Sequence, residues 1–546
     1  MGVETSADHG EHISPAVAPQ FPQHSSQESM GFQKPAQGSV NSAIPKVTWR
    51  SVVMAMFVSM GGLLFGYDTG QISGFEQESN YLRRYGMQKA DGTWYLSDVR
   101  SGLLTSLLSI GTLIGALVAA PIANRVGRKW SITIWNIILI VGLVVQITAP
   151  SGNWVQMVMG RWTTGLGVGA CSLLVPMYMG ESAPRHIRGA MISTYQLFVT
   201  FGILLAYLIN LGTNTLTGTA QWRITLGLTF LFALALGGGM AFFPESPRFD
   251  YRHGHVDRAR TTMSKLYGVP ENHQVILEEL DEIQNQLEAE TGSEKWYEFL
   301  TAPRMFHRIC IGMALQTLQQ LTGSNYFFYY GTTIFKGAGL SNSFITQVIL
   351  GAVNFVSTFG GLYTVENFGR RKSLIVGALW LFLCFMIFAS IGHFVLDVKD
   401  PEKTPAPGKG MIFLACIYIA GYAMTWAPMV WTITAELYPS KYRAQGMALA
   451  VAANWLWNFL IGFFTPFITS AIDFAYGYVF AGCMFVAAFV VYFFVIEGRG
   501  RTLEELDWMY VNRVKPWESA NFEVPPLHSH QFEAERKESA YHAENA

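Results

Sequence analysis

Charged residues are scarce in this sequence. They make up 14% of its 546 residues, whereas half of the residues are hydrophobic and 14% are aromatic. Soluble domains average about 25% charged residues, so this composition excludes an ordinary soluble protein. The chain is predicted to cross a membrane many times.

Cysteine is also scarce, and the residue types that catalysis needs are not grouped. The five cysteines all fall in apolar stretches, without the spacing of metal ligands or of a disulfide framework. We find no nucleophile with its base, no metal cluster and no phosphate-binding loop. The glycine-rich run 165–169 lies in an apolar stretch and predicts close helix packing. We therefore expect neither an enzyme nor a cofactor, and the net charge of −1 gives no reason to expect a nucleic acid partner.

Long apolar runs dominate the remaining sequence. The first 45 residues contain none, so we expect no cleavable signal peptide and interpret 1–46 as a disordered cytosolic tail. A membrane-spanning helix needs about 20 apolar residues. Twelve runs approach that length, at about 50–72, 100–122, 131–149, 155–176, 190–210, 223–243, 309–335, 344–365, 373–396, 411–434, 445–470 and 475–496. They predict a first half over 47–243, a second half over 308–496 and a cytosolic tail over 497–546.

The polar segment 244–307 between the halves is predicted to be an intracellular helical linker. Its stretches 255–267 and 274–290 place apolar residues at helical spacing. Lys and Arg gather in the short loops after the second, fourth, eighth and tenth runs, and the opposite loops carry little charge. By the positive-inside rule, these basic loops and both tails face the cytosol. No N-glycosylation sequon falls in the predicted outer loops.

The same landmarks recur in both halves, in the same order and at nearly the same offset. They are Gly127, Arg128, Glu181, Arg188 and Glu245 in the first half and Gly369, Arg370, Glu436, Arg443 and Glu497 in the second. Each follows the same run of its half. The halves are therefore predicted to share one topology, related by an axis along the membrane normal. Such halves can rock about a central site and open it to either side in turn.

The recurring charged residues have a mechanical interpretation. All lie at predicted cytosolic helix ends, and Arg is well suited to bidentate pairing with carboxylates. We predict a latch between the halves that breaks when they rock, formed by Arg128, Glu181, Arg188, Glu245, Arg370, Glu436, Arg443 and Glu497. The alternative is that these charges only anchor helix ends and set topology. That alternative explains the basic residues but not the recurring carboxylates.

The seventh run contains an unusual group of amides. Gln319, Gln320 and Asn325 lie there together, and Tyr329 and Tyr330 follow. A neutral amide both donates and accepts hydrogen bonds, so amides beside aromatic rings suit an uncharged ligand rich in hydroxyls, such as a sugar. The nearby glycine at 323 lets another backbone or a ligand come close. The alternative is that these amides only bond neighbouring helices.

Several motifs together resemble those of a known family. They are Gly160-Arg161, Pro176-x-Tyr178-x-x-Glu181, Pro244-Glu245-Ser246-Pro247-Arg248, Gln319-Gln320-Leu321-Thr322-Gly323-x-Asn325 and Glu497-Gly498-Arg499-Gly500-Arg501-Thr502. Over roughly residues 50–510 the chain resembles the sugar-porter branch of the major facilitator superfamily, and the run 325–335 resembles fungal hexose transporters. The resemblance implies an all-α membrane protein with twelve transmembrane helices in two six-helix halves. It also implies transport of a monosaccharide, with glucose as the expected hexose, by alternating access.

The resemblance also implies which residues contact the sugar. The matching positions are Gln196, Gln319, Gln320, Asn325, Asn354 and Trp431, with Tyr422, Trp455 and Asn458 lining the same region. Tyr329 and Tyr330 would cap the site from outside. A lone Trp or Tyr otherwise indicates core packing or an interfacial belt. In the tenth run, Trp426 and Pro428 predict a helix break, which can tilt and gate the site.

Asp68 in the first run and Arg161 in the fourth are the candidates for proton coupling. An ionisable residue within a span is a functional candidate by default. In proton-coupled sugar porters a matching Asp takes up the proton and a matching Arg favours its charged form. This predicts sugar–proton symport. Facilitative fungal carriers also keep an Asp here, so a uniporter with a structural Asp68 stays open.

A non-transporting sugar sensor is the alternative of another class, although sensors in this family carry long tails and only about 50 residues follow the last run. The preferred sugar is not set by residue types. We expect a monomer in the lipid bilayer of the plasma membrane, with a small-molecule sugar and protons as its partners.

Overall fold

The computed structural model describes residues 47–184, 187–290, 300, 303–337, 342–397, 405–439, 442–499, 501 and 503–522. These residues fall within one contact unit, which begins at Pro45. The predicted tail 1–46 lies outside the described residues, as do residues 523–546 of the predicted C-terminal tail.

The first half contains six membrane-spanning segments, and the first of them is divided into two helices. They are α1 (Trp49–Val58) with α2 (Met60–Phe75), α4 (Asp98–Val126), α5 (Arg128–Ile147), α6 (Trp154–Ser182), α7 (Arg188–Thr213) and α8 (Ala220–Met240). Between α2 and α4 the chain forms the short helix α3 (Ser79–Tyr85) and an antiparallel hairpin of β1 (Met87–Gln88) and β2 (Trp94–Tyr95). Five of these six segments, all except α6, are long and apolar enough to cross a membrane, as predicted.

The second half repeats this arrangement. Its helices are α13 (Met305–Gln320) with α14 (Ser324–Gly337), α15 (Ser343–Asn367), α16 (Arg370–Ser390), α17 (Pro405–Met424) with α18 (Trp426–Glu436), α19 (Arg443–Ile472) and α20 (Tyr476–Phe494). A π-helical turn, Ile391–Val395, extends α16, and a 3₁₀ turn, Asp473–Ala475, joins α19 to α20. Nine described segments are long and apolar enough to cross a membrane on their own, and one of them combines α19 with α20.

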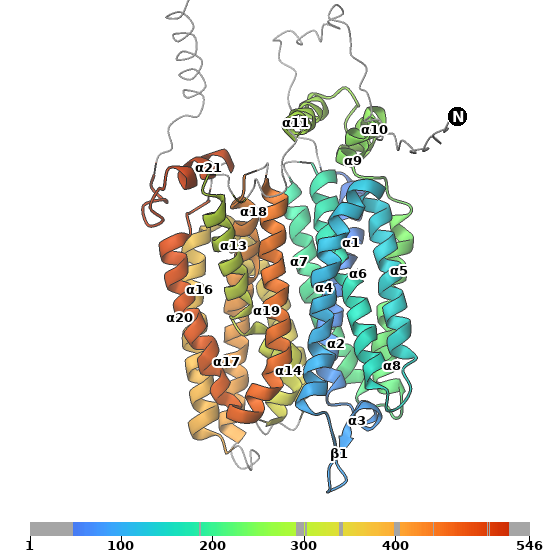
Figure 1. Ribbon diagram of the computed structural model, residues 1–546, viewed down its shortest axis with the longest axis vertical. Helices are drawn as coiled ribbons and strands as arrows, with labels where there is room; N and C mark the ends of the chain where they lie inside the picture. Colours follow the sequence, from blue (N-terminus) through green and yellow to red (C-terminus); the bar gives the residue numbers. More distant parts are fainter. Residues whose placement is uncertain are drawn as a thin grey trace, which may run out of the picture. The chain divides into compact units, whose positions relative to one another are not determined.

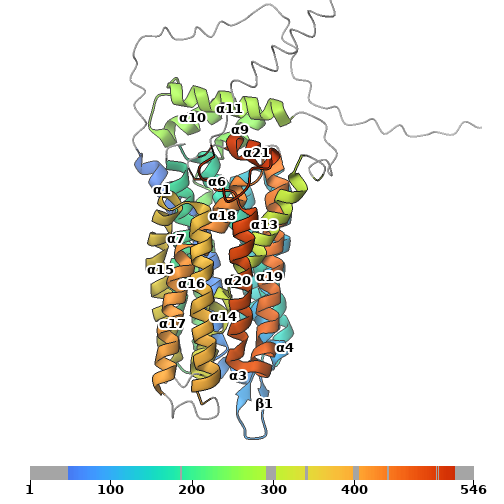
Figure 2. The same ribbon diagram turned by 90° about the vertical axis from the view of Figure 1, so that its left-hand side faces the viewer.

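Short helices cover one end of the bundle, and the hairpin marks the other (Figure 1). Between the halves lie α9 (Pro247–Arg252), α10 (Val256–Tyr267) and α11 (Gln274–Glu290), and α21 (Leu503–Val511) follows the last span. Figure 2 shows α10 and α11 lying across the ends of the long helices. Both predicted amphipathic helices are thereby confirmed. We call this end the helical-loop end, and the end with α3, β1 and β2 the hairpin end.

Two of the spans are broken by backbone geometry that the sequence signals. Thr425 adopts φ −125° and ψ −79° between α17 and α18, which confirms the break predicted beside Trp426. Gly323 turns the chain between α13 and α14 with φ +85°, a conformation that favours glycine. A Cβ there would lie 2.7 Å from Phe480 and 2.8 Å from Phe385. Aromatic side chains therefore occupy the space beside Gly323, and the expectation that a backbone or a ligand would approach it is wrong.

The described contacts between the halves gather toward the hairpin end. Helix α4 lies along α19, α7 along α15, and α2 along α14. The hydrogen bonds there include Ser73 to Thr332, and Gln77 to Thr333 and Lys336. Thr358 of α15 donates to Thr200 of α7 deeper in the bundle, at 3.4 Å. The structure therefore has its hairpin end closed.

Candidate functional site

A network of buried amides lies where α13 meets α19. Asn454 of α19 is its centre: its Oδ1 accepts from Nε2 of Gln320 at 2.9 Å. Its Nδ2 donates to Oε1 of Gln316 at 2.7 Å and to Oε1 of Gln319 at 2.9 Å. Buried polar groups need such partners, and here the amides supply them to each other.

The break at Gly323 extends this network into α14. Because the chain turns there, Nδ2 of Asn325 reaches back to Oε1 of Gln320 at 2.6 Å. Asn458, one turn after Asn454, donates to the same oxygen at 3.3 Å. The Oδ1 of Asn458 accepts from Tyr329 at 3.0 Å and from Ser109 of α4 at 2.6 Å. The predicted residues Gln319, Gln320, Asn325 and Asn458 thus lie in one network that touches both halves.

Three other predicted sugar-binding residues do not join this network. Among the described hydrogen bonds, no side-chain bond links Gln196, Asn354 or Trp431 to the amides. Asn354 is buried in α15, Gln196 is half-buried in α7, and Trp431 of α18 is 37% exposed.

Trp455 of α19 lies beside α2 of the first half. Its ring lies edge-on to Phe65 of α2, with 5.5 Å between the ring centroids. Its indole Nε1 is buried and has no hydrogen-bond partner among the described residues. A buried donor without a partner is costly, so a ligand oxygen at this point would be favourable. The ring of Tyr422 lies 6.5 Å from that of Phe328.

The two tyrosines predicted to cap the site are buried within the second half. Tyr329 bonds Asn458, and the hydroxyl of Tyr330 donates to the carbonyl oxygen of Gly462 at 2.6 Å. Both therefore fasten α14 to α19.

Asp68 of α2 and Arg161 of α6 form a buried ion pair. Nη2 of Arg161 lies 3.6 Å from Oδ2 of Asp68, and the side chains are 2% and 1% exposed. Gln71, one turn after Asp68, donates to Oδ1 at 2.6 Å. Tyr329 lies close enough to interact electrostatically with both charges. The ion pair and the amide network are therefore neighbours.

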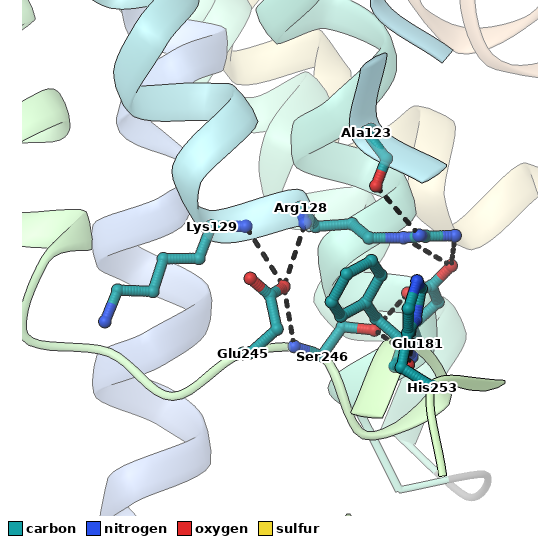
Figure 3. Close-up of polar contacts among 8 residues, drawn as sticks. Ala123, Arg128, Lys129, Glu181, Glu245, Ser246 and His253 are labelled. Atoms are coloured by element: carbon teal, nitrogen blue, oxygen red, sulfur yellow. Dashed lines mark hydrogen bonds and ion pairs between the residues drawn. The ribbon is translucent and has the colours of Figure 1, made fainter. Parts of the chain in front are cut away.

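At the helical-loop end, the repeated charged motifs form the same contacts in each half, and Figure 3 shows those of the first motif. In the first half, Arg128 donates to Glu181 at 3.0 Å, and Glu245 accepts from the backbone N–H groups of Arg128 and Lys129 at 2.9 and 3.1 Å. Ser246 also donates its hydroxyl to Glu181. Burial raises the pKa of Glu245, while the backbone donors oppose this effect.

In the second half, Arg370 donates to Glu436 at 3.0 Å. Glu497 accepts from the backbone N–H groups of Arg370 and Arg371 at 2.7 and 3.1 Å. The glycine before each Arg makes this possible. Gly127 and Gly369 have φ of +99° and +85°, and a Cβ would lie 2.4 Å from Glu245 and 2.8 Å from Glu497, respectively.

These contacts correct one part of the predicted latch. Each of the two ion pairs lies within one half, whereas we expected the lattice to join the halves. Arg188 begins α7 and pairs with Glu279 of α11, not with one of the predicted carboxylates. Arg443 begins α19. The role of these residues in rocking stays a prediction.

The sequence reasoning missed Gln316, Asn454, Gln71 and Ser109. A signal existed for two of them. Gln316 precedes Gln320 by four positions and Asn454 precedes Asn458 by four, so each pair lies on one face of its helix. Polar residues repeated at this spacing in an apolar span indicate a buried network.

The comparison with known proteins identifies the family. A family model described as "Sugar (and other) transporter" matches residues 54–510. The chain belongs to this family. It is 46% identical over 475 residues to the low-affinity glucose transporter HXT3 of Saccharomyces cerevisiae, covering 86% of this chain and 84% of the relative. It is also 46% identical over 474 residues to a low-affinity glucose transporter of Kluyveromyces lactis, covering 86% and 83%.

Solved structures of sugar transporters share the fold. The proton:xylose symporter XylE bound to 6-bromo-6-deoxy-D-glucose superimposes with a TM-score of 0.70 at 26% identity, covering 84% of this chain and 99% of XylE. A partially occluded, inward-open XylE from E. coli gives a TM-score of 0.68. These findings confirm the predicted family and the twelve-helix fold in two halves. They also agree with a sugar transporter rather than an enzyme.

Proposed function

We propose that this sugar transporter carries a hexose, with glucose as the first candidate, by alternating access and together with protons. The observation that carries the proposal is the amide network around Asn454. Amides can exchange their bonds to one another for bonds to sugar hydroxyls with little net change in hydrogen bonding. In our proposal, the unpartnered indole N–H of Trp455, the residue after Asn454, supplies a further donor to the sugar. The names of the two yeast relatives support glucose.

Residues outside the network complete the proposed site. Gln196 and Asn354 belong to helices that meet across the interface between the halves, α7 and α15. In our proposal, Gln196 and Asn354 contact the sugar from the side opposite to α13. The exposed Trp431 packs a face of its ring against the sugar. Closure at the hairpin end is consistent with a state in which the sugar leaves toward the helical-loop end. Rocking would part Ser73 from Thr332 and open the other side.

Proton coupling is the finer part of the proposal and rests on Asp68. Its separation of 3.6 Å from Arg161 is longer than a tight ion pair, so the two groups are not locked together and movement of α2 against α6 can change their separation. Nε and Nη1 of Arg161 have no hydrogen-bond partner among the described residues. Uniport is the alternative, because Arg161 and Gln71 together can hold Asp68 as a permanently ionised, structural carboxylate.

We also propose how the chain sits in the cell. The basic loops lie at the helical-loop end, which we assign to the cytosol by the positive-inside rule. Both tails, 1–46 and 497–546, and the linker 244–307 would then be cytosolic, flanking the halves 47–243 and 308–496. We expect a monomer in the plasma membrane, without nucleic acid or metal partners.

The test uses purified protein in liposomes. Radiolabelled glucose uptake is recorded with and without an inward proton gradient, for the unchanged chain, Asp68→Asn and the control Asp91→Asn. Asp91 lies exposed in the hairpin loop, where it accepts bonds from Thr93. We expect accumulation above equilibrium for the unchanged chain and the control, and equilibration only for Asp68→Asn.

Other outcomes would overturn parts of the proposal. Uptake that stops at equilibrium whatever the gradient would establish uniport and a structural Asp68. Saturable glucose binding without uptake would establish a sensor. A chain that neither binds nor moves hexoses would refute the proposed site.

A further inference from the structure

A buried carboxyl that the mechanism above does not use lies at the hairpin end. Glu76 ends α2 and is 8% exposed. Its Oε1 accepts hydrogen bonds from the hydroxyls of Ser101 at 2.6 Å and Thr105 at 3.2 Å, both on α4. Hydroxyls can donate to a carboxylate or accept from a carboxylic acid, so this site accommodates Glu76 with or without a proton.

Glu76 lies within the contact that closes this end. On one side Ser73 bonds Thr332 of α14, and on the other Gln77 bonds Thr333 and Lys336 of the same helix. Glu76 therefore sits on the short stretch of α2 and its cap that joins the second half. Opening of this end must change its surroundings.

Few charged groups face this carboxyl. Arg161 of α6 interacts with it, as do the phenols of Tyr81 of α3 and Tyr330 of α14. Glu78, two residues further on, is fully buried and interacts with Tyr81. Arg100 of α4 donates to the backbone oxygens of Tyr85 and Gly86. No described residue forms an ion pair with Glu76 within 4.0 Å.

We propose that Glu76 is a second proton-binding site, distinct from Asp68, and that proton binding there favours closure of the hairpin end. The step is a simple transfer: a hydronium ion from the medium gives its proton to the carboxylate and leaves as water. A neutral carboxyl tolerates burial against α4 and α14, whereas a charged one favours the open, hydrated state. The proposal deepens the alternating access proposed above and holds for symport or uniport.

The direction of the pH effect follows from the same physics. In the closed state burial raises the pKa of Glu76 to about 7, opposed by Ser101, Thr105 and Arg161. Proton binding therefore supports closure fully below the ordinary pKa of a glutamate, about 4.3, and this support falls as the pH rises and is lost above about pH 7. In the open state the carboxyl regains water and its ordinary acidity.

The test measures closure itself and does not depend on sugar transport. Thr332 is buried in the closed contact, whereas Thr93 is exposed in the hairpin loop. Thr332→Cys and, as a control, Thr93→Cys are each labelled with a membrane-impermeant maleimide from the hairpin side between pH 5.5 and 8.5. The rate for Thr332→Cys divided by the rate for Thr93→Cys removes the pH dependence of the thiol chemistry. The unsubstituted chain corrects for the native cysteines.

We expect the normalised rate to rise several-fold between pH 5.5 and about 7 and to level off above that value, and to stay low at every pH once Glu76→Gln is added. Ser101→Ala removes a donor that favours the charged carboxylate, so it should move the midpoint to higher pH. A normalised rate that does not change with pH, or that changes equally in Glu76→Gln, would overturn the proposal. Failure of glucose uptake alone would count against the proposed function and leave this result unaffected.

Discussion

Gln320 and Asn454 are joined by a hydrogen bond of 2.9 Å, although 134 positions separate them in the sequence. Asn454 also holds Gln316 and Gln319, so a single side chain of α19 orients three amides of α13. Groups held in place before the ligand arrives lose less entropy on binding. The network is therefore a preorganised surface, and its centre is a residue that the sequence reasoning did not select.

Replacing Asn454 should weaken sugar binding. In Asn454→Leu, three glutamines lose a shared partner, and each buried hydrogen bond is worth about 1 kcal/mol. We expect KM for glucose to rise about ten-fold, since 1.4 kcal/mol corresponds to a factor of ten. The control is Asn136→Leu, because Asn136 is an equally buried amide of α5 that bonds Ile132 and Cys171. An unchanged KM in a well-inserted Asn454→Leu protein would contradict the proposed site.

Variants of two tryptophans in the second half should separate an effect on sugar binding from an effect on protein stability. Trp455→Phe removes an N–H that has no partner among the described residues, so Tm should change little while KM rises several-fold. Trp426→Phe removes an N–H that donates to the carbonyl of Leu374 at 3.1 Å. Losing this buried hydrogen bond costs about 0.5–1.5 kcal/mol, so Tm should fall. If the two variants exchanged these phenotypes, the indole of Trp455 would not face the sugar.

The glycine before Arg128 should not tolerate a side chain. In Gly127→Ala, the alanine would have to hold φ +99° with ψ +159°, a region nearly restricted to glycine that costs about 1–3 kcal/mol, and the new Cβ would meet Glu245 at 2.4 Å. The thermal unfolding midpoint of the detergent-solubilised protein should fall. Gly189→Ala is the matched control, because nothing lies within 4 Å of its added Cβ. Equal midpoints for the two variants would show that Glu245 does not need this close approach.

The last short helix, α21, is held to the second half by a buried cation. Arg308 of α13 is buried; it donates to the carboxylate of Asp507 at 2.7 Å and to its backbone oxygen at 3.0 Å. Asp507→Ala strips this charge of its counterion, a loss that typically costs about 3–5 kcal/mol for buried pairs. Because Asp507 is itself 42% exposed, we expect a smaller but clear fall in Tm. Glu518→Ala, which breaks an exposed pair with Lys515, should leave Tm unchanged.

Hydropathy predicted the spans because the membrane imposes one simple rule on length and polarity. The break at Thr425 was also predictable, since Trp426 and Pro428 interrupt the pattern there. The break at Ser59 was not, because Ser59 lies in an unremarkable apolar run and keeps an α-helical φ and ψ. Local patterns predict helices far better than they predict such departures.

The candidate site was only partly predictable. Family motifs pointed to Gln320 and Asn325, but Asn454 becomes central only when α13 and α19 are placed side by side. The recurring charged residues predicted contacts between the halves. The sequence shows which charges recur but not which of them pair in space. Arg188 contacts Glu279, a residue of the linker that no repeated motif marks.

The placement of the polar contacts also bears on how the protein is made. Arg128 and Glu181 belong to the first half and Glu245 follows it directly, so their lattice can form while the ribosome is still adding the second half, as expected of units that fold in order of synthesis. The contact between Ser73 and Thr332 joins residues 259 positions apart. It must wait until α14 has entered the bilayer. During synthesis the first half can thus be fastened at its helical-loop end before any contact between the two halves exists at the hairpin end.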